Sequence, residues 1–195
     1  MMKRTTWAWA LAVMTALHAG PLVPAAMAQA KPKQQRGAIE ATQEARDVVK
    51  ALRSIDSRTA SGINSRDYSR EVGDLKLAVD ALDELLERRN DMRLRDQLAQ
   101  TFAPYQEAKA VWSYCVTSDE CRYDLILLSY SDYGSSRLVL QLLQRYPALN
   151  AAEEQGGVLM DGRSNGRVHL GKLLSSLWAI GKDRSKTIRA SLQPG

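Results

Sequence analysis

The sequence is poor in the residues that build metal and redox sites, because its 195 residues include only two cysteines and two histidines. One histidine lies in the N-terminal segment described next, which leaves His169 alone in the rest of the chain. Zinc and haem sites that need two histidines are therefore excluded there. Cys115 and Cys121 do not form a Cys-x-x-Cys motif, so they predict a structural disulfide. We expect neither a metal site nor a cofactor.

Long apolar runs are also scarce, and the clearest one lies close to the N-terminus. Lys3 and Arg4 precede the apolar stretch Trp7–Leu17, which is followed by prolines and then by small residues. This order is typical of a secretory signal peptide, and the run has about half of the ~20 residues that a membrane-spanning helix needs. We predict cleavage after Ala28 or Ala30, export to the periplasm by the general secretory route, and no transmembrane segment after cleavage.

The remainder of the chain is predicted to form a single domain. Residues 1–30 are the predicted signal peptide, 31–37 a disordered lead, 38–190 the helical domain and 191–195 a flexible tail. The signal peptide holds two of the 27 basic residues and none of the 22 acidic ones, which leaves a net charge of +3. Such a small excess in an exported protein argues against nucleic acid as a partner.

Apolar residues recur at three- and four-residue steps, which predicts amphipathic helices. A first helix is expected over Ile39–Ile55, followed by a small-residue linker at Ser57–Gly62. The clearest helix begins at Asn64, which can cap it together with Asp67, and ends at Asn90. Its buried seam is predicted to contain Tyr68, Val72, Leu75, Val79, Leu82 and Leu86.

A second arm starts at Asp91 and is predicted to pack antiparallel to the first. Pro104 lies inside this arm and predicts a kink there or the start of a new helix. One continuous helix would place Cys115 and Cys121 about 9 Å apart along its axis and on different faces. A disulfide between them therefore requires a break in the helix.

Later apolar stretches predict one or two further helices over Leu125–Leu128 and Leu138–Tyr146, with an irregular joint at Ser129–Ser136. Pro147 should end them, and a last helix is expected from about Val168. We detect no segment with the two-residue period of a strand. The predicted fold class is all-α, a small helical bundle of four to six helices with one short-loop disulfide.

Three segments carry a resemblance to a known group of proteins. They are Ser61–Tyr68, Ala78–Asp80 and Tyr105–Trp112. Together they resemble a pattern in uncharacterised exported bacterial α-helical proteins with no known activity. The resemblance implies a helical fold and carries no activity, ligand or partner.

The glycine-rich loop before the last helix is the first candidate site. Ser164 or Asn165 is expected to cap that helix, whose free N–H groups would hold an anion. The candidate anion-binding residues are Arg163, Ser164, Asn165, Arg167 and Lys172. From Met160 onward the chain has seven basic and two acidic residues, which also favours an anionic ligand. The same stretch fails as a nucleotide-binding loop, because Leu173 stands where a hydroxyl is needed.

The irregular joint is the second candidate, because pockets tend to form where regular structure is interrupted. The candidate pocket residues are Tyr130, Asp132, Tyr133 and Arg137. By contrast, we interpret the carboxylates of the clearest helix as a solvated face, because Lys76 and Arg88 are interspersed among them. These carboxylates are Asp80, Asp83, Glu84 and Glu87. Trp112 and Trp178 are in phase with the apolar seams and are predicted to pack in the core.

These observations favour a non-catalytic periplasmic helical domain that acts as a partner-binding or envelope-associated module. Its expected partner is an envelope protein or an anionic envelope component. The alternative is a periplasmic protein that binds a small ligand or an anion at one of the two candidate sites. An enzyme is least favoured, since the sequence contains no complete nucleophile motif, metal cluster or cofactor loop.

Overall fold

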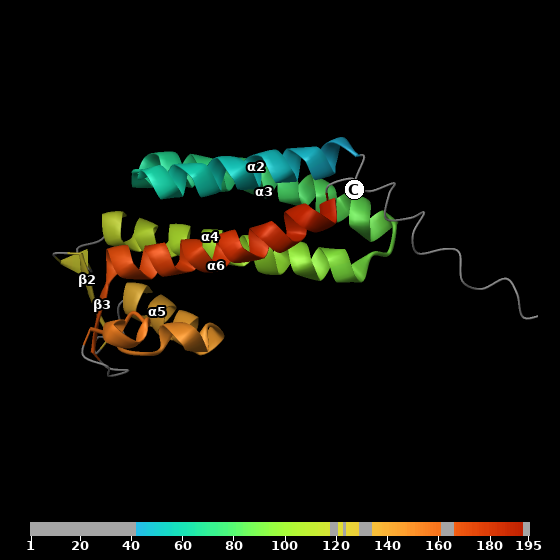
Figure 1. Ribbon diagram of the computed structural model, residues 1–195. Coiled ribbons are helices and arrows are strands. Elements are labelled where there is room, and N and C mark those ends of the chain that lie inside the picture. Colours follow the sequence, from blue (N-terminus) through green and yellow to red (C-terminus); the bar gives the residue numbers. More distant parts are fainter. Residues whose placement is uncertain (1–41, 118–120, 123, 129–133, 161–165, 193–195) are drawn as a thin grey trace, which may run out of the picture.

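The computed structural model describes residues 42–117, 121–122, 124–128, 134–160 and 166–192 (Figure 1). The predicted signal peptide and lead lie outside these residues. The described chain contains five α-helices, which agrees with the predicted all-α fold of four to six helices. They are α2 (Gln43–Ser61), α3 (Ser65–Arg88), α4 (Met92–Thr117), α5 (Gly134–Arg145) and α6 (Leu170–Leu192). None of the described helices is long and apolar enough to cross a membrane.

Four of these helices form an antiparallel bundle. Helix α2 packs on α3, α3 on α4, α4 on α6, and α6 on α2, so the helices close a ring around one core. Figure 1 shows α2 and α3 as an upper pair, α4 and α6 beneath them, and α5 as an additional layer on the far side of α4 and α6. The chain between α4 and α6 is therefore an insertion at one end of the bundle.

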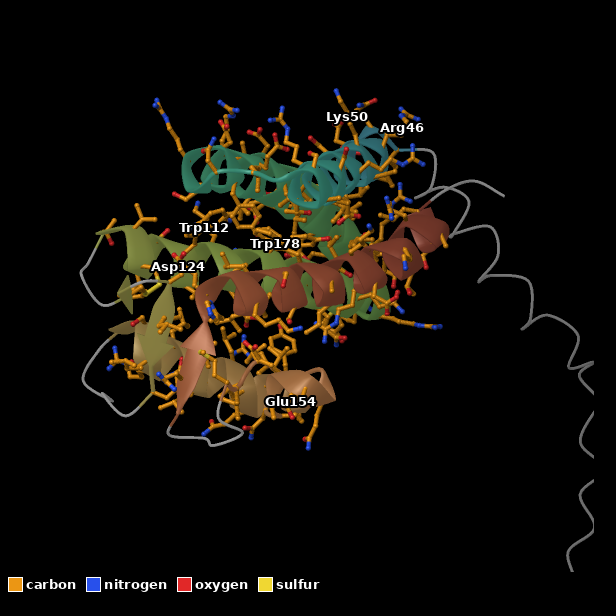
Figure 2. The ribbon with its side chains drawn as sticks, turned by 60° about the vertical axis from the view of Figure 1, so that its left-hand side comes forward. Arg46, Lys50, Trp112, Asp124, Glu154 and Trp178 are labelled. Atoms are coloured by element: carbon orange, nitrogen blue, oxygen red, sulfur yellow. A yellow bond between two sulfur atoms is a disulfide. The ribbon has the colours of Figure 1, made fainter. Side chains whose placement is uncertain are left out.

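The core follows the apolar periodicity of the sequence. The predicted seam of α3 is buried, and Tyr68, Leu75 and Leu82 have no exposed surface. Trp112 and Trp178 are labelled in Figure 2, and their ring centroids are 5.8 Å apart. Each of the two rings lies within 5.7 Å of the Tyr68 ring. The predicted core packing of both tryptophans is confirmed, since they pack against the buried cluster.

Helix α2 is longer than the sequence indicated. The small-residue linker predicted from Ser57 is wrong, because the helix continues to Ser61. The hydroxyls of Thr59 and Ser61 donate to backbone carbonyls one turn earlier, at 2.8 Å and 3.1 Å, so these small residues satisfy their polar groups within the helix. Gly62 ends α2 with a φ of +89°, a conformation that favours glycine.

The turns at both ends of α3 are those predicted. Asn64 Oδ1 accepts from the backbone N–H of Asp67 at 2.9 Å, and Asn64 Nδ2 donates to the Asp67 carboxylate at 2.7 Å. After α3, Asn90 adopts a left-handed conformation with a φ of +55°. Asp91 then accepts from the N–H of Leu94 at 3.1 Å and starts α4. The chain thus reverses within a short turn, and α4 returns antiparallel to α3.

Helix α4 continues across Pro104 as a single element, so no new helix begins there. Proline has no N–H, which leaves the carbonyl of Gln100 without its helical donor. The guanidinium of Arg184 in α6 donates to this carbonyl at 2.8 Å. The carbonyl that Pro104 leaves without a helical donor therefore forms a hydrogen bond between α4 and α6.

The predicted disulfide is confirmed, and so is the break that it requires. Helix α4 ends at Thr117, and Cys121 belongs to strand β1 (Cys121–Arg122). The Cα atoms of Cys115 and Cys121 are 4.9 Å apart. The bond therefore ties the end of α4 to the start of the insertion.

The insertion contains a small sheet that the sequence analysis missed. Strands β1, β2 (Leu125–Leu127) and β3 (Arg167–His169) pair antiparallel in that order. The helix predicted at Leu125–Leu128 is therefore wrong, and the sheet lies in segments where no two-residue period was detected. Ile126 pairs with Val168, and both are fully buried between more exposed neighbours. Strands of two or three residues are too short to show a two-residue period.

The rest of the insertion contains α5 and two short 3-10 helices, Pro147–Leu149 and Glu153–Gln155. Helix α5 confirms the helix predicted before Pro147, but it begins at Gly134, so residues 134–136 of the predicted irregular joint are helical. Helix α6 begins at Leu170, two residues later than expected, because the preceding residues belong to β3. It runs through Leu192, which is only 2% exposed, so residues 191 and 192 do not belong to a flexible tail.

Candidate functional site

An open groove of about 480 Å³ lies between α3 and α4. The two helices pack antiparallel, and their facing sides supply all of its lining. From α3 it is lined by Lys76, Val79, Asp80 and Asp83, and from α4 by Met92, Arg95, Asp96, Leu98, Ala99, Phe102 and Gln106. The groove therefore has apolar as well as charged walls.

The apolar part of the groove is the outer edge of the bundle core. Val79, Leu98 and Phe102 are 8%, 1% and 6% exposed, so they are fixed by packing on their inner side. Ala99 is exposed and has only a methyl group, and Met92 is 54% exposed despite its apolar side chain. Ala99 and Met92 therefore supply most of the apolar surface that solvent can reach, above the buried side chains.

Charged side chains form the rim. The guanidinium of Arg95 donates from Nε and Nη2 to the two carboxylate oxygens of Asp83, both at 2.8 Å. This bidentate pair lowers the pKa of Asp83 below its usual range. Arg95 also lies 3.5 Å from the carboxylate of Glu87, and Lys76 pairs with Asp80 at 2.5 Å. Both cations of the groove thus already face carboxylates.

The carboxylates of α3 form a solvated face only in part. The pairing of Lys76 with Asp80 agrees with a solvated face. Asp83, however, binds Arg95 on the next helix and not a neighbour on its own helix. The turn predicted at Asn90 could have indicated this ion pair, because residues at similar distances before and after a tight antiparallel turn lie opposite each other.

Three carboxylates of the described bundle helices are buried, and each is held by one or two hydroxyls and an arginine. Asp56 of α2 is 7% exposed. It accepts from Tyr105 Oη of α4 at 2.5 Å and from Ser185 Oγ of α6 at 2.7 Å. The guanidinium of Arg189 lies 3.5 Å from the same carboxylate. This one side chain connects three helices of the bundle.

The other two buried carboxylates follow the same scheme. Glu71 of α3 accepts from Ser54 Oγ at 2.7 Å and pairs with Arg58 of α2 at 2.8 Å. Glu107 of α4 accepts from Tyr146 Oη at 2.6 Å and from the guanidinium of the arginine that precedes this tyrosine. Each carboxylate thus bridges two parts of the fold.

These buried groups support the structure and do not present reactive atoms to solvent. Burial raises the pKa of Tyr105 well above its usual range, and the adjacent Asp56 carboxylate raises it further. Burial likewise raises the pKa of Tyr68 and that of Tyr146. The sequence could have indicated that Asp56 is buried, because Asp56 lies four residues after Leu52 and therefore on the apolar face of α2.

No family model, curated protein or solved structure matches the chain. The resemblance to exported helical proteins therefore stays a prediction. Among the described residues, no group of three or more histidine, cysteine, aspartate or glutamate side chains is placed to hold a metal ion.

The first predicted site, the anion-binding loop, is only partly described. Arg163, Ser164 and Asn165 lie outside the described residues. Arg167 is exposed on β3, and Lys172 is exposed in the first turn of α6. The expectation that Ser164 or Asn165 caps α6 is wrong, because a strand separates them from the helix. The first N–H of α6, that of Leu170, donates to the carbonyl of Asp124 at 2.8 Å.

The basic residues later in α6 take part in internal contacts. Arg184 lies over the Tyr146 ring at 5.4 Å from its centroid, in addition to its bond to the Gln100 carbonyl. Arg189 pairs with Asp56, and Lys186 lies 3.6 Å from an Asp183 carboxylate oxygen. Three of the seven basic residues of the C-terminal segment thus contact this chain's own groups.

The second predicted site, at the joint before α5, also falls mostly outside the described residues. Tyr130, Asp132 and Tyr133 are not described, and Arg137 is exposed on the second turn of α5. The groove between α3 and α4 is therefore the candidate site whose lining is described in full.

Proposed function

We propose that this chain is a non-catalytic helical domain, exported by the general secretory route to the periplasm, that binds a partner in the groove between α3 and α4. Export is supported by the N-terminal sequence pattern and by the disulfide between Cys115 and Cys121, since disulfides persist in oxidising compartments. The groove itself is the observation that carries the binding role.

The groove has the properties of a protein-binding surface. Exposed Ala99 and Met92 lie among charged side chains, and apolar contacts bordered by polar groups are found at specific interfaces. Val79, Leu98 and Phe102 lie buried beneath this surface and hold both helices in place, which reduces the entropic cost of association. Exposed Met92 adds an adaptable apolar side chain at one end.

The buried polar groups support a non-catalytic role. The two oxygens of Asp56 accept from Tyr105 and Ser185, and those of Glu107 likewise have donors. A carboxylate that is already bonded in this way is poorly placed to accept a proton from a substrate. These two buried carboxylates thus have structural partners.

A variant that fills the groove tests the proposal. Ala99→Trp adds a large side chain at an exposed position of the lining, and Ala190→Trp makes the same change on an exposed site of α6, outside the groove. Each mature domain is immobilised and incubated with envelope extract of the producing bacterium. We expect proteins retained by the unmodified domain and by Ala190→Trp to be lost with Ala99→Trp. Equal retention by all three would contradict the proposal.

A further inference from the structure

Methionine is scarce after the predicted signal peptide, and one of the two methionines there is open to solvent. The chain beyond residue 30 contains only Met92 and Met160. Met92 is 54% exposed, whereas Met160 is less exposed. A thioether is readily oxidised to a sulfoxide, and exposure to solvent gives the oxidant access to the sulfur. Met92 is therefore the methionine that an oxidant reaches more easily.

The sulfur of Met92 also faces a hydrogen-bond donor. Arg95 Nη1 donates to Met92 Sδ at 3.9 Å. The other two nitrogens of the guanidinium, Nε and Nη2, donate to Asp83 at 2.8 Å, and Nη2 lies 3.5 Å from Glu87. In the described part of the chain, Nη1 has no acceptor besides this sulfur. Because a thioether is only a weak acceptor, the hydrogen-bonding capacity of Nη1 is poorly used.

The donor is held in place, whereas the sulfur is free to adjust. The bidentate contact with Asp83 fixes the plane of the Arg95 guanidinium, and this side chain is only 24% exposed. Met92 is the first residue of α4 and has an unbranched side chain with three rotatable bonds. Its end can therefore turn beside Nη1 without disturbing the helix.

We propose that Met92 is a reversible oxidation site, at which a peroxide converts the thioether to a sulfoxide whose oxygen accepts a hydrogen bond from Arg95 Nη1. A lone pair of the sulfur attacks one oxygen of hydrogen peroxide, so that the O–O bond breaks and an S–O bond forms. The proton on the sulfur-bound oxygen passes to the leaving hydroxide, which departs as water. The sulfur is oxidised by two electrons and the peroxide is reduced. The charge-assisted N–H···O bond is stronger than the N–H···S contact that it replaces.

Oxidation at this position changes the surface of the groove. Met92 and Ala99 supply most of the apolar surface that solvent can reach there. A sulfoxide is polar, so the contribution of Met92 to this surface is lost. We expect the oxidised domain to hold its partner more weakly. This consequence rests on the proposed function, whereas the oxidation of Met92 and its hydrogen bond to Arg95 do not.

Peptide mass spectrometry after limited treatment of the mature domain with hydrogen peroxide tests the site itself. We expect sulfoxide to form at Met92 at least about fivefold faster than at Met160. Equal rates at the two methionines, or faster oxidation of Met160, would overturn the proposal.

The hydrogen bond to Arg95 has a separate readout. In NMR spectra of the 15N-labelled domain, the guanidinium N–H signals of Arg95 should shift when Met92 is oxidised. Met92→Leu is the matched control, because it keeps an apolar side chain and has no sulfur to oxidise. Its Arg95 signals should not move under the same treatment. Unchanged Arg95 signals in the oxidised unmodified domain, or equal shifts in both proteins, would show that Arg95 does not bind the sulfoxide.

The effect on binding is measured with the envelope extract used for Ala99→Trp. Proteins retained by the untreated domain should be retained at least about fivefold less after peroxide treatment. Methionine sulfoxide reductase with dithiothreitol should restore them. Met92→Leu, carried through both treatments, should retain them throughout, which controls for effects of either reagent on the disulfide.

The outcomes separate this inference from the proposed function. If Ala99→Trp loses the retained proteins and the oxidised domain keeps them, regulation by Met92 is wrong and the groove remains a binding site. If Ala99→Trp retains them as well as the unmodified domain does, the proposed function fails. The oxidation site then stands or falls on the mass spectra and the Arg95 signals alone.

Discussion

Replacing Asp56 by alanine should be among the most damaging single changes to the bundle. The Tyr105 hydroxyl would become a buried donor that has lost its acceptor, and the Arg189 side chain, which is 20% exposed, would lose its counter-charge. Ser185 is less affected, because its hydroxyl also donates to the carbonyl of Lys182 at 3.0 Å. The damage therefore comes mainly from the tyrosine and the arginine.

The size of the effect follows from these contacts. Removing one partner of a buried ion pair costs about 3–5 kcal/mol, which includes the uncompensated group left behind. We expect Asp56→Ala to lower the free energy of unfolding by this amount. Tyr105→Phe removes one hydrogen bond to a charged acceptor and should cost about 1.5–3 kcal/mol.

Urea unfolding followed by far-UV circular dichroism measures both values. Asp74→Ala is the control, since Asp74 is an exposed carboxylate of α3, and it should change stability by less than about 0.5 kcal/mol. A loss below about 1 kcal/mol for Asp56→Ala would refute the reasoning, because the network would then not be buried and bonded as described. If Asp56→Ala does not fold, Tyr105→Phe provides the same test at smaller amplitude.

Three further measurements probe the packing. Leu75→Ala should cost about 2–5 kcal/mol in urea unfolding, because Leu75 has no exposed surface, whereas Leu77→Ala should be nearly neutral at 70% exposure. Gly181→Ala should cost about 1–3 kcal/mol, since its methyl group would lie 2.7 Å from the Tyr105 ring, and Gly171→Ala, which meets open space, should not destabilise the domain. Stability should fall as pH rises above about 10, because the buried tyrosines have raised pKa values when folded and ionise more readily when unfolded. Tyr146→Phe should reduce this loss of stability at high pH. Ultraviolet absorbance of tyrosinate during the pH titration follows the ionisation, and an absorbance profile unchanged by Tyr146→Phe would contradict the raised pKa of Tyr146.

The bundle was predictable from the sequence where local signals and tertiary packing agree. The cap at Asn64, the turn at Asn90 and the apolar seam of α3 each depend on residues close together in the chain. The disulfide was predictable because only one pairing exists, and it forced a break after α4.

The parts that sequence reasoning missed depend on distant partners. Ile126 looks like part of a short helix until Val168 is placed beside it. Asp56 looks like one more solvated acid, since its partners Tyr105 and Ser185 lie far along the chain. The groove was missed for a related reason, because its lining residues come from two helices and lie together only when both helices are packed.

The position of α6 as the last element of the ring also determines the order in which the domain can assemble. Helices α2, α3 and α4 are joined by short turns and can pair early, whereas the Ser185 contact with Asp56 spans 129 residues of chain. Contacts so distant form slowly, because the loop must close before they stabilise anything. Without α6, helices α2, α3 and α4 lack the cover that α6 gives to Tyr105 and Trp112. Apolar surface exposed in this way is recognised by chaperones and aggregates readily. We therefore expect truncation within α6 to yield a chaperone-bound or aggregated chain and not a smaller folded domain.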